Sequence, residues 1–437
     1  MLSKEDNELL TKIGPGSAMG EMLREYWIPV LMSSELPERD GPPLRVRLLG
    51  EDLIAFRTTS GVIGLMDQAC PHRTASLYFG RNEEDGIRCV YHGWKFNVHG
   101  HCVDMPNEVP DKRFHHKIRV KAYTCQERNG IVWAYMGKRS KPPPLPDFEW
   151  NTDPENEPFF WRNYRACNWV QALEGDVDSS HLNYLHRSLD EEDRWTVPGK
   201  PLPGFTEAQL PLLDTDRSPE LEVSDTEYGA VYGAKRRLDN NLAYWRIRPF
   251  LFPFHTMVGG GIDDSSVCYS GKAWIPMDDE QTLVLEWRYR PGRPWSQEER
   301  KQLLQNRIPW GFAEPTTEPA GAWKPKAHAG NDYFLDRDLE REKLFCGIIS
   351  SPLQDAAVQE SMGPISDRTR EHLGPSDAMI IRVRRRLLQA AKDLRDRGTV
   401  PPGVDEPCIY RVRPVAAIIP TDADWLEMTR RRRLETA

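Results

Sequence analysis

This 437-residue sequence has little cysteine, no excess of positive charge and no long apolar run. Its eight cysteines are too few and too scattered for a disulfide framework, so cysteines that pair with histidines indicate a metal site. The net charge of −8 argues against a general binder of nucleic acids or membrane surfaces. No stretch reaches the about 18 apolar residues of a membrane span, and the charged N-terminus lacks a signal-peptide core. We therefore expect a cytoplasmic protein with no nucleic-acid or membrane partner.

The chain is long enough for about two or three domains, and its patterns change along its length. Residues 1–40 predict a helical N-terminal segment, with a helix over roughly GEMLREYWIPVLM. Residues 41–150 hold short segments of branched and aromatic residues between Gly, Asp and Asn turns, which predicts a small all-β domain. The proline-rich stretch KRSKPPPLPDFEW ends it. Residues 151–437 mix strands and helices, so we expect an α+β domain with a C-terminal extension, in which helices cover an antiparallel sheet.

Two short motifs in the predicted β domain combine cysteine with histidine: CPHR offers Cys70 and His72, and CVYHGW offers Cys89 and His92. Such a set can hold zinc or a 2Fe–2S cluster. In common zinc modules the cysteines pair locally and the histidines follow, whereas here each motif supplies one of each. One iron of a cluster would then receive two thiolates and the other two imidazoles, which is Rieske ligation. A structural zinc site and ordinary buried cysteines are the alternatives.

A second constellation lies in CNWVQALEGDVDSSHLNYLH, which supplies Asp178, His181 and His186. Asp178 and His181 share one face of a helix, but His186 lies about 140° around it from His181, so a regular helix could not bring both histidines to one ion. The helix must deform or end there. Two imidazoles and one carboxylate form the facial triad of non-haem Fe(II) oxygenases. Asp178 is the nearest acid, and spacing alone leaves the identity of the carboxylate open.

Both constellations resemble those of one family. CPHR and CVYHGWKF resemble the Rieske domains of bacterial aromatic-ring-hydroxylating oxygenases. The second constellation and KIGPGSAMGEMLREYWIPV resemble their phthalate 4,5-dioxygenase-like branch, close to the O-demethylases of lignin-derived acids. This resemblance implies a 2Fe–2S cluster and a mononuclear Fe(II). It also implies a third iron ligand far downstream, in SSPLQDAAVQESMGPISDRTREHLGPSD, where Asp355 is the first candidate and Glu360 and Asp367 are weaker ones.

The same resemblance gives Asp178 a catalytic task other than metal binding. In the family, the matching aspartate connects a cluster-ligating histidine of one subunit to an iron-ligating histidine of the next. Carried over, Asp178 joins His92 of one subunit to His181 of its neighbour. Such a carboxylate fixes the orientation of both imidazoles, and the arrangement implies a ring-shaped oligomer, which we expect to be a homotrimer.

The resemblance further implies an enzyme that uses O2 and electrons from NAD(P)H, delivered by a separate reductase with or without a ferredoxin. The expected reaction is hydroxylation or dihydroxylation of an aromatic carboxylate, or O-demethylation of a methoxylated one. A carboxylate suits a bidentate arginine, and Arg246 in LAYWRIRPFLFPF matches an arginine position of the branch. Arg236 and Arg237 are a second choice, and a structural ion pair is the other interpretation of Arg246.

Two further interpretations concern partners. The basic segment IIRVRRRLLQAAKDLRDR could dock the reductase or could be a solvated helix face. From a different class comes the hypothesis of a Rieske electron-transfer or redox-sensing protein, whose second domain binds a partner without catalysis. That hypothesis predicts one iron centre where the oxygenase hypothesis predicts two.

Overall fold

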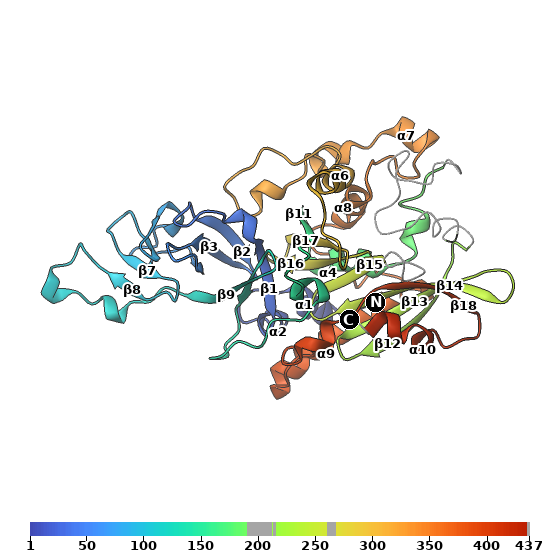
Figure 1. Cartoon of the computed structure of the whole chain (residues 1–437), viewed down its shortest axis with the longest axis horizontal. Coiled ribbons are helices and arrows are strands. Elements are labelled where there is room, and N and C mark those ends of the chain that lie inside the picture. The colour runs from blue at the N-terminus through green and yellow to red at the C-terminus, as the bar shows by residue number, and fades with distance from the viewer. Residues whose placement is uncertain (190–211, 213–215, 260–267, 435–437) are drawn as a thin grey trace.

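The computed structural model describes residues 1–189, 212, 216–259 and 268–434 (Figure 1). A small β-rich unit forms one end of the molecule, and a larger unit of sheet and helices forms the rest. The prediction of a small all-β unit followed by an α+β unit is confirmed. The exact boundaries at residues 40 and 150 remain predictions.

The small unit contains two antiparallel sheets. The six-stranded sheet has the order β1 (Trp27–Met32), β10 (Ile131–Tyr135), β9 (Ala122–Arg128), β4 (Ile63–Asp67), β3 (Glu51–Arg57) and β2 (Leu44–Leu48). The four-stranded sheet has the order β5 (Arg81–Glu83), β6 (Gly86–Arg88), β7 (Lys95–Asn97) and β8 (Cys102–Asp104). A separate core between the two sheets gathers Cys70, Cys89, Trp94 and Phe96 with Met66 of β4, so the cysteine–histidine motifs lie where the two sheets meet.

The helix predicted over GEMLREYWIPVLM is wrong in its second half. Helix α2 (Ala18–Arg24) ends before Tyr26, and Trp27–Met32 forms strand β1, which pairs with β10. The run WIPVLM is rich in branched and aromatic residues that suit a strand, and Pro29 has no N–H to donate inside a helix. Part of the predicted N-terminal helical segment therefore belongs to the six-stranded sheet.

The larger unit is built on an eight-stranded antiparallel sheet. Its order is β11 (Phe159–Arg165), β17 (Thr282–Tyr289), β16 (Tyr269–Pro276), β15 (His255–Gly259), β14 (Leu242–Leu251), β13 (Gly229–Arg237) and β12 (Glu220–Thr226), and β18 (Val415–Pro420) pairs with β14. The main helices around it are α1 (Lys4–Thr11), α4 (Trp169–Val177), α6 (Gln297–Arg307), α8 (Ser351–Ser361) and α9 (Ala378–Arg397). None of the helices in the described ranges combines the length and apolar character that crossing a bilayer requires.

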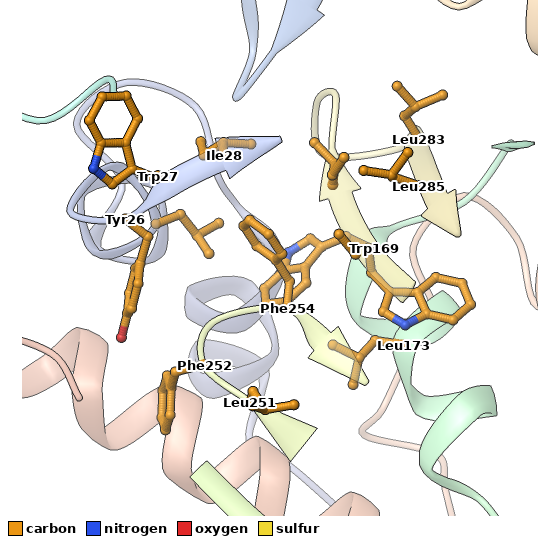
Figure 2. Close-up of a cluster of buried hydrophobic side chains, with 14 of the residues drawn as sticks. Tyr26, Trp27, Ile28, Trp169, Leu173, Leu251, Phe252, Phe254, Leu283 and Leu285 are labelled. Atoms are coloured by element: carbon orange, nitrogen blue, oxygen red, sulfur yellow. The ribbon is translucent and has the colours of Figure 1, made fainter. Parts of the chain in front are cut away.

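A single apolar core joins the two units. Figure 2 shows Trp27 and Ile28 of β1 close to Trp169 and Leu173 of α4 and to Phe254, all buried. Because α4 is held by this shared core, its C-terminal end, where the second constellation begins, has a fixed position. Apolar burial of side chains this large is the main stabilising contribution to such an arrangement.

Candidate functional sites

The two cysteine–histidine loops of the small unit have nearly the same backbone. In the first, Thr74 N–H donates to the Cys70 carbonyl at 2.8 Å and Cys70 N–H donates to the Ala75 carbonyl at 2.9 Å. In the second, Gly93 N–H donates to the Cys89 carbonyl at 2.9 Å and Cys89 N–H donates to the Trp94 carbonyl at 2.8 Å. The fifth residue of each loop, Thr74 or Gly93, has a positive φ. Each loop thus presents one cysteine and one histidine from equivalent turns.

The four side chains divide into a buried pair and a more exposed pair. Cys70 and Cys89 are 1% and 3% exposed, whereas His72 and His92 are half-buried. The two imidazole rings have centroids 4.5 Å apart, and the His72 ring stacks on Trp94 at 4.4 Å. Two thiols therefore meet on the inner side and two imidazoles on the outer side, the division that a Rieske cluster requires.

The chemistry of these side chains fits a cationic iron–sulfur group. Burial raises the pKa of the Cys70 thiol to about 11, and the neighbouring Cys89 adds to the increase. A thiolate pair in this place therefore needs a metal to stabilise it. The Nδ1 atom of His92 is buried and has no hydrogen-bond partner among the described residues, so it is available as a ligand.

The second constellation begins where α4 ends. As the spacing of the two histidines required, the helix does not continue through them: α4 ends at Val177, and Asp178 has an extended backbone with φ −78° and ψ 127°. A single 3-10 turn, His181–Asn183, follows. The change of direction brings Nε2 of His181 to 3.2 Å from Nε2 of His186, which an unbroken helix would have kept apart.

Helix α8 adds a carboxylate to the two histidines. Oδ1 of Asp355 lies 3.2 Å from Nε2 of His186 and 3.8 Å from Nε2 of His181. The other two downstream candidates are engaged elsewhere: Glu360 accepts hydrogen bonds from the Tyr333 hydroxyl and the Ala166 N–H, and Asp367 accepts from Thr369. In the described part of the chain, His181, His186 and Asp355 are the group of three side chains whose ligand atoms converge closely enough for one metal ion.

The electrostatics of this triad favour a bound cation. Burial on its own would raise the pKa of Asp355, but His186 and then His181 hold it well below its ordinary value. Burial on its own would lower the pKa of His181, yet the hydrogen bond to Asp178 and the charge of Asp355 raise it. In both cases the surroundings stabilise positive charge between the side chains. A divalent metal ion supplies such charge, and the donor set of two imidazoles and one carboxylate fits mononuclear iron.

Two further side chains orient the two histidines by contacting Nδ1, the ring nitrogen that faces away from the triad. Oδ2 of Asp178 lies 3.4 Å from Nδ1 of His181, so Asp178 contacts the ring nitrogen that faces away from the triad. Oε1 of Gln354 lies 2.6 Å from Nδ1 of His186, and Nε2 of Gln354 donates to the Ile348 carbonyl at 2.6 Å. The second bond fixes which end of the amide faces the histidine. Sequence reasoning missed Gln354, and its position beside Asp355 was the only available signal.

Buried arginines occupy the sheet face next to the triad. Arg246 and Arg248 of β14 point to one face, as strand alternation predicted, and are 4% and 6% exposed. Arg236 of β13 lies on the same face, is fully buried, and donates to Oδ1 of Asn183 at 3.1 Å, within the turn that begins at His181. Arg237 is exposed and pairs with Glu220. The structure thus separates Arg236 from Arg237 and places three guanidinium groups on one buried face.

Comparison with known proteins identifies the family. Residues 26–124 match the Rieske 2Fe–2S domain, and residues 134–436 match the family described as LigXa C-terminal domain like. The chain belongs to the Rieske non-haem iron aromatic-ring-hydroxylating oxygenases, as an oxygenase component of the phthalate 4,5-dioxygenase-like and lignin-acid O-demethylase-like branch.

Three curated relatives cover nearly the whole chain. It is 41% identical to the 3-chlorobenzoate-3,4-dioxygenase oxygenase subunit of Comamonas testosteroni, over 97% of each chain. It is 35% identical to the phthalate 4,5-dioxygenase oxygenase subunit of Pseudomonas putida, over 97% of this chain and 94% of that protein. It is 32% identical to the 5,5'-dehydrodivanillate O-demethylase oxygenase subunit of Sphingobium sp. (strain NBRC 103272 / SYK-6), over 96% of this chain and 87% of that protein.

A solved structure agrees on the fold. The structure of NdmA from Pseudomonas putida CBB5 with caffeine superposes with a TM-score of 0.61 at 19% identity, over 89% of this chain and 96% of that one. The curated relatives and the Rieske domain show that the protein is an enzyme, an oxidoreductase of a multicomponent Rieske system, whose cofactors are a 2Fe–2S cluster and mononuclear iron. It works with a reductase or ferredoxin that supplies electrons. The hypothesis of a non-catalytic electron-transfer or sensing protein is not favoured.

Proposed function

We propose that this oxygenase acts on an aromatic carboxylate, which it hydroxylates or dihydroxylates on the ring or from which it removes an O-methyl group. The observation that carries the substrate class is the buried face bearing Arg236, Arg246 and Arg248 beside the histidine turn. Guanidinium groups in a dry site bind carboxylates through paired hydrogen bonds. The names of the three relatives, which refer to chlorobenzoate, phthalate and dehydrodivanillate, support an acidic aromatic substrate.

The proposed metal ligands fall into two sets. The cluster ligands are Cys70, His72, Cys89 and His92, and the iron ligands are His181, His186 and Asp355. When bound, the cluster stores an electron and the iron is the place where O2 is reduced beside the substrate. The protein contributes the rest: Gln354 and Asp178 hold the two imidazoles so that their Nε2 atoms face Asp355.

Arg246 is the proposed substrate anchor. Its backbone lies between Ala234 of β13 and Ala416 of β18, so its position is fixed from both sides of β14. A carboxylate held by its guanidinium would present the aromatic ring toward the triad in a constant orientation. Arg248 adds positive charge on the same face, close enough to act electrostatically on His181 and Asp176.

Asp178 is the proposed connection between subunits. Its contact with His181 fits one half of that role, and its side chain stays 25% exposed, so a second imidazole can approach it. His92, on the loop between β6 and β7, is half-buried, so part of its ring is open to another chain. This arrangement requires the small unit of one subunit, which carries the cluster ligands, to lie against the iron site of the next subunit, as in a homotrimer.

The electrons would come from NAD(P)H through a separate reductase. A cytoplasmic location, where NAD(P)H is available, is part of this proposal.

The proposal is tested by a single turnover of the reduced protein with O2 and a panel of aromatic acids. We expect product from a carboxylate, with a dihydrodiol or phenol for ring oxidation and formaldehyde for O-demethylation. The methyl ester of each acid is the matched control, since it keeps the ring and removes the charge. Arg246→Gln should raise KM for the acid and leave the weak reaction of the ester unchanged. Equal turnover of acid and ester would contradict the carboxylate assignment.

A further inference from the structure

Two other arginines meet inside the larger unit, away from β14. Arg288 lies on β17, and Arg307 is the last residue of α6; each is only 7% exposed. They share one carboxylate, Glu286, whose Oε2 lies 3.7 Å from Nη2 of Arg307, beyond hydrogen-bonding distance. Glu286 and Arg288 are two residues apart on β17 and so point to the same face of the sheet. Two cations are therefore buried around a single anion.

Several donors of this pair are unused. Nε and Nη2 of Arg288 and Nε of Arg307 are buried and have no hydrogen-bond partner among the described residues. A guanidinium group presents its N–H groups as a rigid fork that matches an oxyanion, and leaving such charged donors buried without an acceptor is costly. The guanidinium of Arg307 packs against an aromatic ring, since the Trp161 ring centroid lies 5.0 Å from Cζ of Arg307.

The neighbouring groups do not neutralise the extra charge. Lys272, which lies opposite Glu286 on β16, pairs with Asp176 at 2.5 Å, so that carboxylate is already used. Burial raises the pKa of the Cys268 thiol, which therefore contributes no negative charge at neutral pH. Arg290, the residue after the end of β17, pairs with Glu299 at 3.3 Å, so the carboxylate of Glu299 is also already used. Burial, and then the charge of Arg307, lower the pKa of Arg288 to about 10, so Arg288 remains cationic at neutral pH.

We propose that Arg288 and Arg307 form a binding site for a small carboxylate-type oxyanion. The site is separate from the proposed substrate anchor, because β16 and β15 lie between β17 and β14. At about 4.8 Å between neighbouring strands, three steps separate the two sites by roughly 14 Å. The oxyanion has two sources, a free carboxylate from solution or an acidic group at the far end of the substrate. Both make the same paired hydrogen bonds to guanidinium.

The first test measures thermal unfolding of the metal-loaded protein in sodium acetate, with sodium chloride added to keep the ionic strength constant. We expect Tm to rise with acetate and to saturate, as mass action predicts for one site. The variants are made on an Arg246→Gln background, which removes the proposed substrate anchor: Arg246→Gln alone should keep the rise, and adding Arg288→Gln or Arg307→Gln should abolish it. Arg288→Lys keeps the charge but loses the fork, so the acetate concentration at half-saturation should increase at least 10-fold.

Two outcomes overturn the proposal. One is a rise in Tm that never saturates or that all variants share. The other, which holds even if the glutamine variants do not fold, is an Arg288→Lys protein with the wild-type acetate midpoint. The assay needs no turnover, so its failure is distinct from a failure of the proposed substrate class.

A second experiment separates the two sources, using benzoate and terephthalate as probes of equilibrium binding to the metal-loaded protein. If the site holds a free anion, saturating acetate leaves the Kd of both probes unchanged. If it holds an acidic group of the substrate, acetate raises the Kd of terephthalate and not that of benzoate. Once the first test has shown a saturating rise in Tm, these two results identify the source of the oxyanion at Arg288 and Arg307. Equal competition by acetate against both probes in wild type and in Arg288→Gln overturns it, because acetate then acts at the substrate anchor alone.

Discussion

Nδ1 of His186 lies 2.6 Å from Oε1 of Gln354, and this contact determines which nitrogen of the imidazole carries its proton. Because Nε2 of the same amide donates to the Ile348 carbonyl, the oxygen must face the histidine, and Nδ1 must be the protonated nitrogen. Nε2 of His186 is then left with a lone pair toward Asp355. Gln354, which is neutral, thus orients the ring of His186 in the way that Asp178 orients the ring of His181.

Replacing Gln354 should therefore weaken iron binding without disturbing the cluster. We expect Gln354→Leu to lower the affinity for mononuclear iron about 10–100-fold, the usual effect of removing a residue that supports a metal ligand. Iron retained after dialysis against a chelator measures this, and the visible absorption of the cluster should not change. Gln359→Leu is the matched control, since Gln359 is a buried glutamine on the same helix that bonds the Ala172 carbonyl. Wild-type iron retention in Gln354→Leu would show that the contact has no role.

Removal of the Asp355 carboxylate should empty the mononuclear iron site and leave the cluster site intact. Asp355→Ala is expected to lose the mononuclear iron and all oxygenase activity while keeping the acid-labile sulfide and the cluster absorption. Cys70→Ser should lose the sulfide instead. Asp367→Ala, on the same downstream segment, should keep both metals, because Asp367 bonds only its neighbour Thr369 in the described structure. Loss of iron in Asp367→Ala but not in Asp355→Ala would reverse the ligand assignment.

Asp178→Asn should slow electron transfer from the cluster to the iron site without loss of the cluster or the mononuclear iron. The amide keeps the size of the carboxylate but loses the charge that favours a proton on Nδ1 of His181. We expect the rate at which O2 and substrate reoxidise the reduced cluster, followed by stopped-flow absorption, to fall about 10–100-fold. Iron and sulfide contents should match wild type. A variant that reoxidises at the wild-type rate would exclude Asp178 from the path between subunits.

A buried ion-pair network on α4, the helix that ends just before Asp178, should make the free energy of unfolding depend on pH in the acid range. Glu174 of α4 lies between Arg368 and Arg384, with contacts of 3.1 and 2.6 Å. Glu174→Gln leaves two buried guanidinium groups without their shared carboxylate and should cost about 3–5 kcal/mol in the free energy of unfolding, measured by urea denaturation at pH 7. Glu371→Gln, which removes a more exposed carboxylate from Arg384, is the control and should cost less.

The pH dependence of that difference has a definite sign. Burial would raise the pKa of Glu174, but Arg368 and Arg384 outweigh it, so the folded-state pKa lies below its ordinary value of 4.5. A depressed carboxyl pKa contributes stability above the unfolded value, and that contribution is lost as pH falls. The difference between wild type and Glu174→Gln should therefore be constant above about pH 5.5 and shrink below pH 4.5. A difference that grows on acidification would contradict this account.

Local chemistry made the cluster loops predictable from sequence. Cys70, His72, Cys89 and His92 lie within 23 residues, and the order of ligand types alone distinguishes a Rieske cluster from common zinc modules. The break after α4 was predictable as well, because His181 and His186 cannot share a face of a regular helix. Strand β1 was missed although WIPVLM suits a strand, because its pairing with β10 joins residues about a hundred positions apart and the preceding residues favour a helix. Tertiary pairing overrode the local helical pattern.

The rest of the site depends on distant contacts. Gln354 contacts His186 across 168 residues of sequence, and spacing gives no reason to connect them. Asp355 was predicted as a ligand through a family resemblance, whereas spacing alone left the carboxylate open, with Asp178 as the nearest acid. Arg288 and Arg307 gain their significance only from the sheet register and from packing against Trp161. Charged residues in a strand or at a helix end look alike in sequence whether they face solvent or lie in the interior.

Strand β18 gives the C-terminal segment an unexpected importance. Residues 415–420 pair with β14 along the stretch that carries Arg246, on the side opposite β13. A truncation before residue 415 would therefore leave the backbone of Arg246 supported on one edge only. Because Arg246 is the proposed substrate anchor, we expect that shortening this segment, or exchanging it with that of a relative, alters which acids are accepted before it alters iron binding.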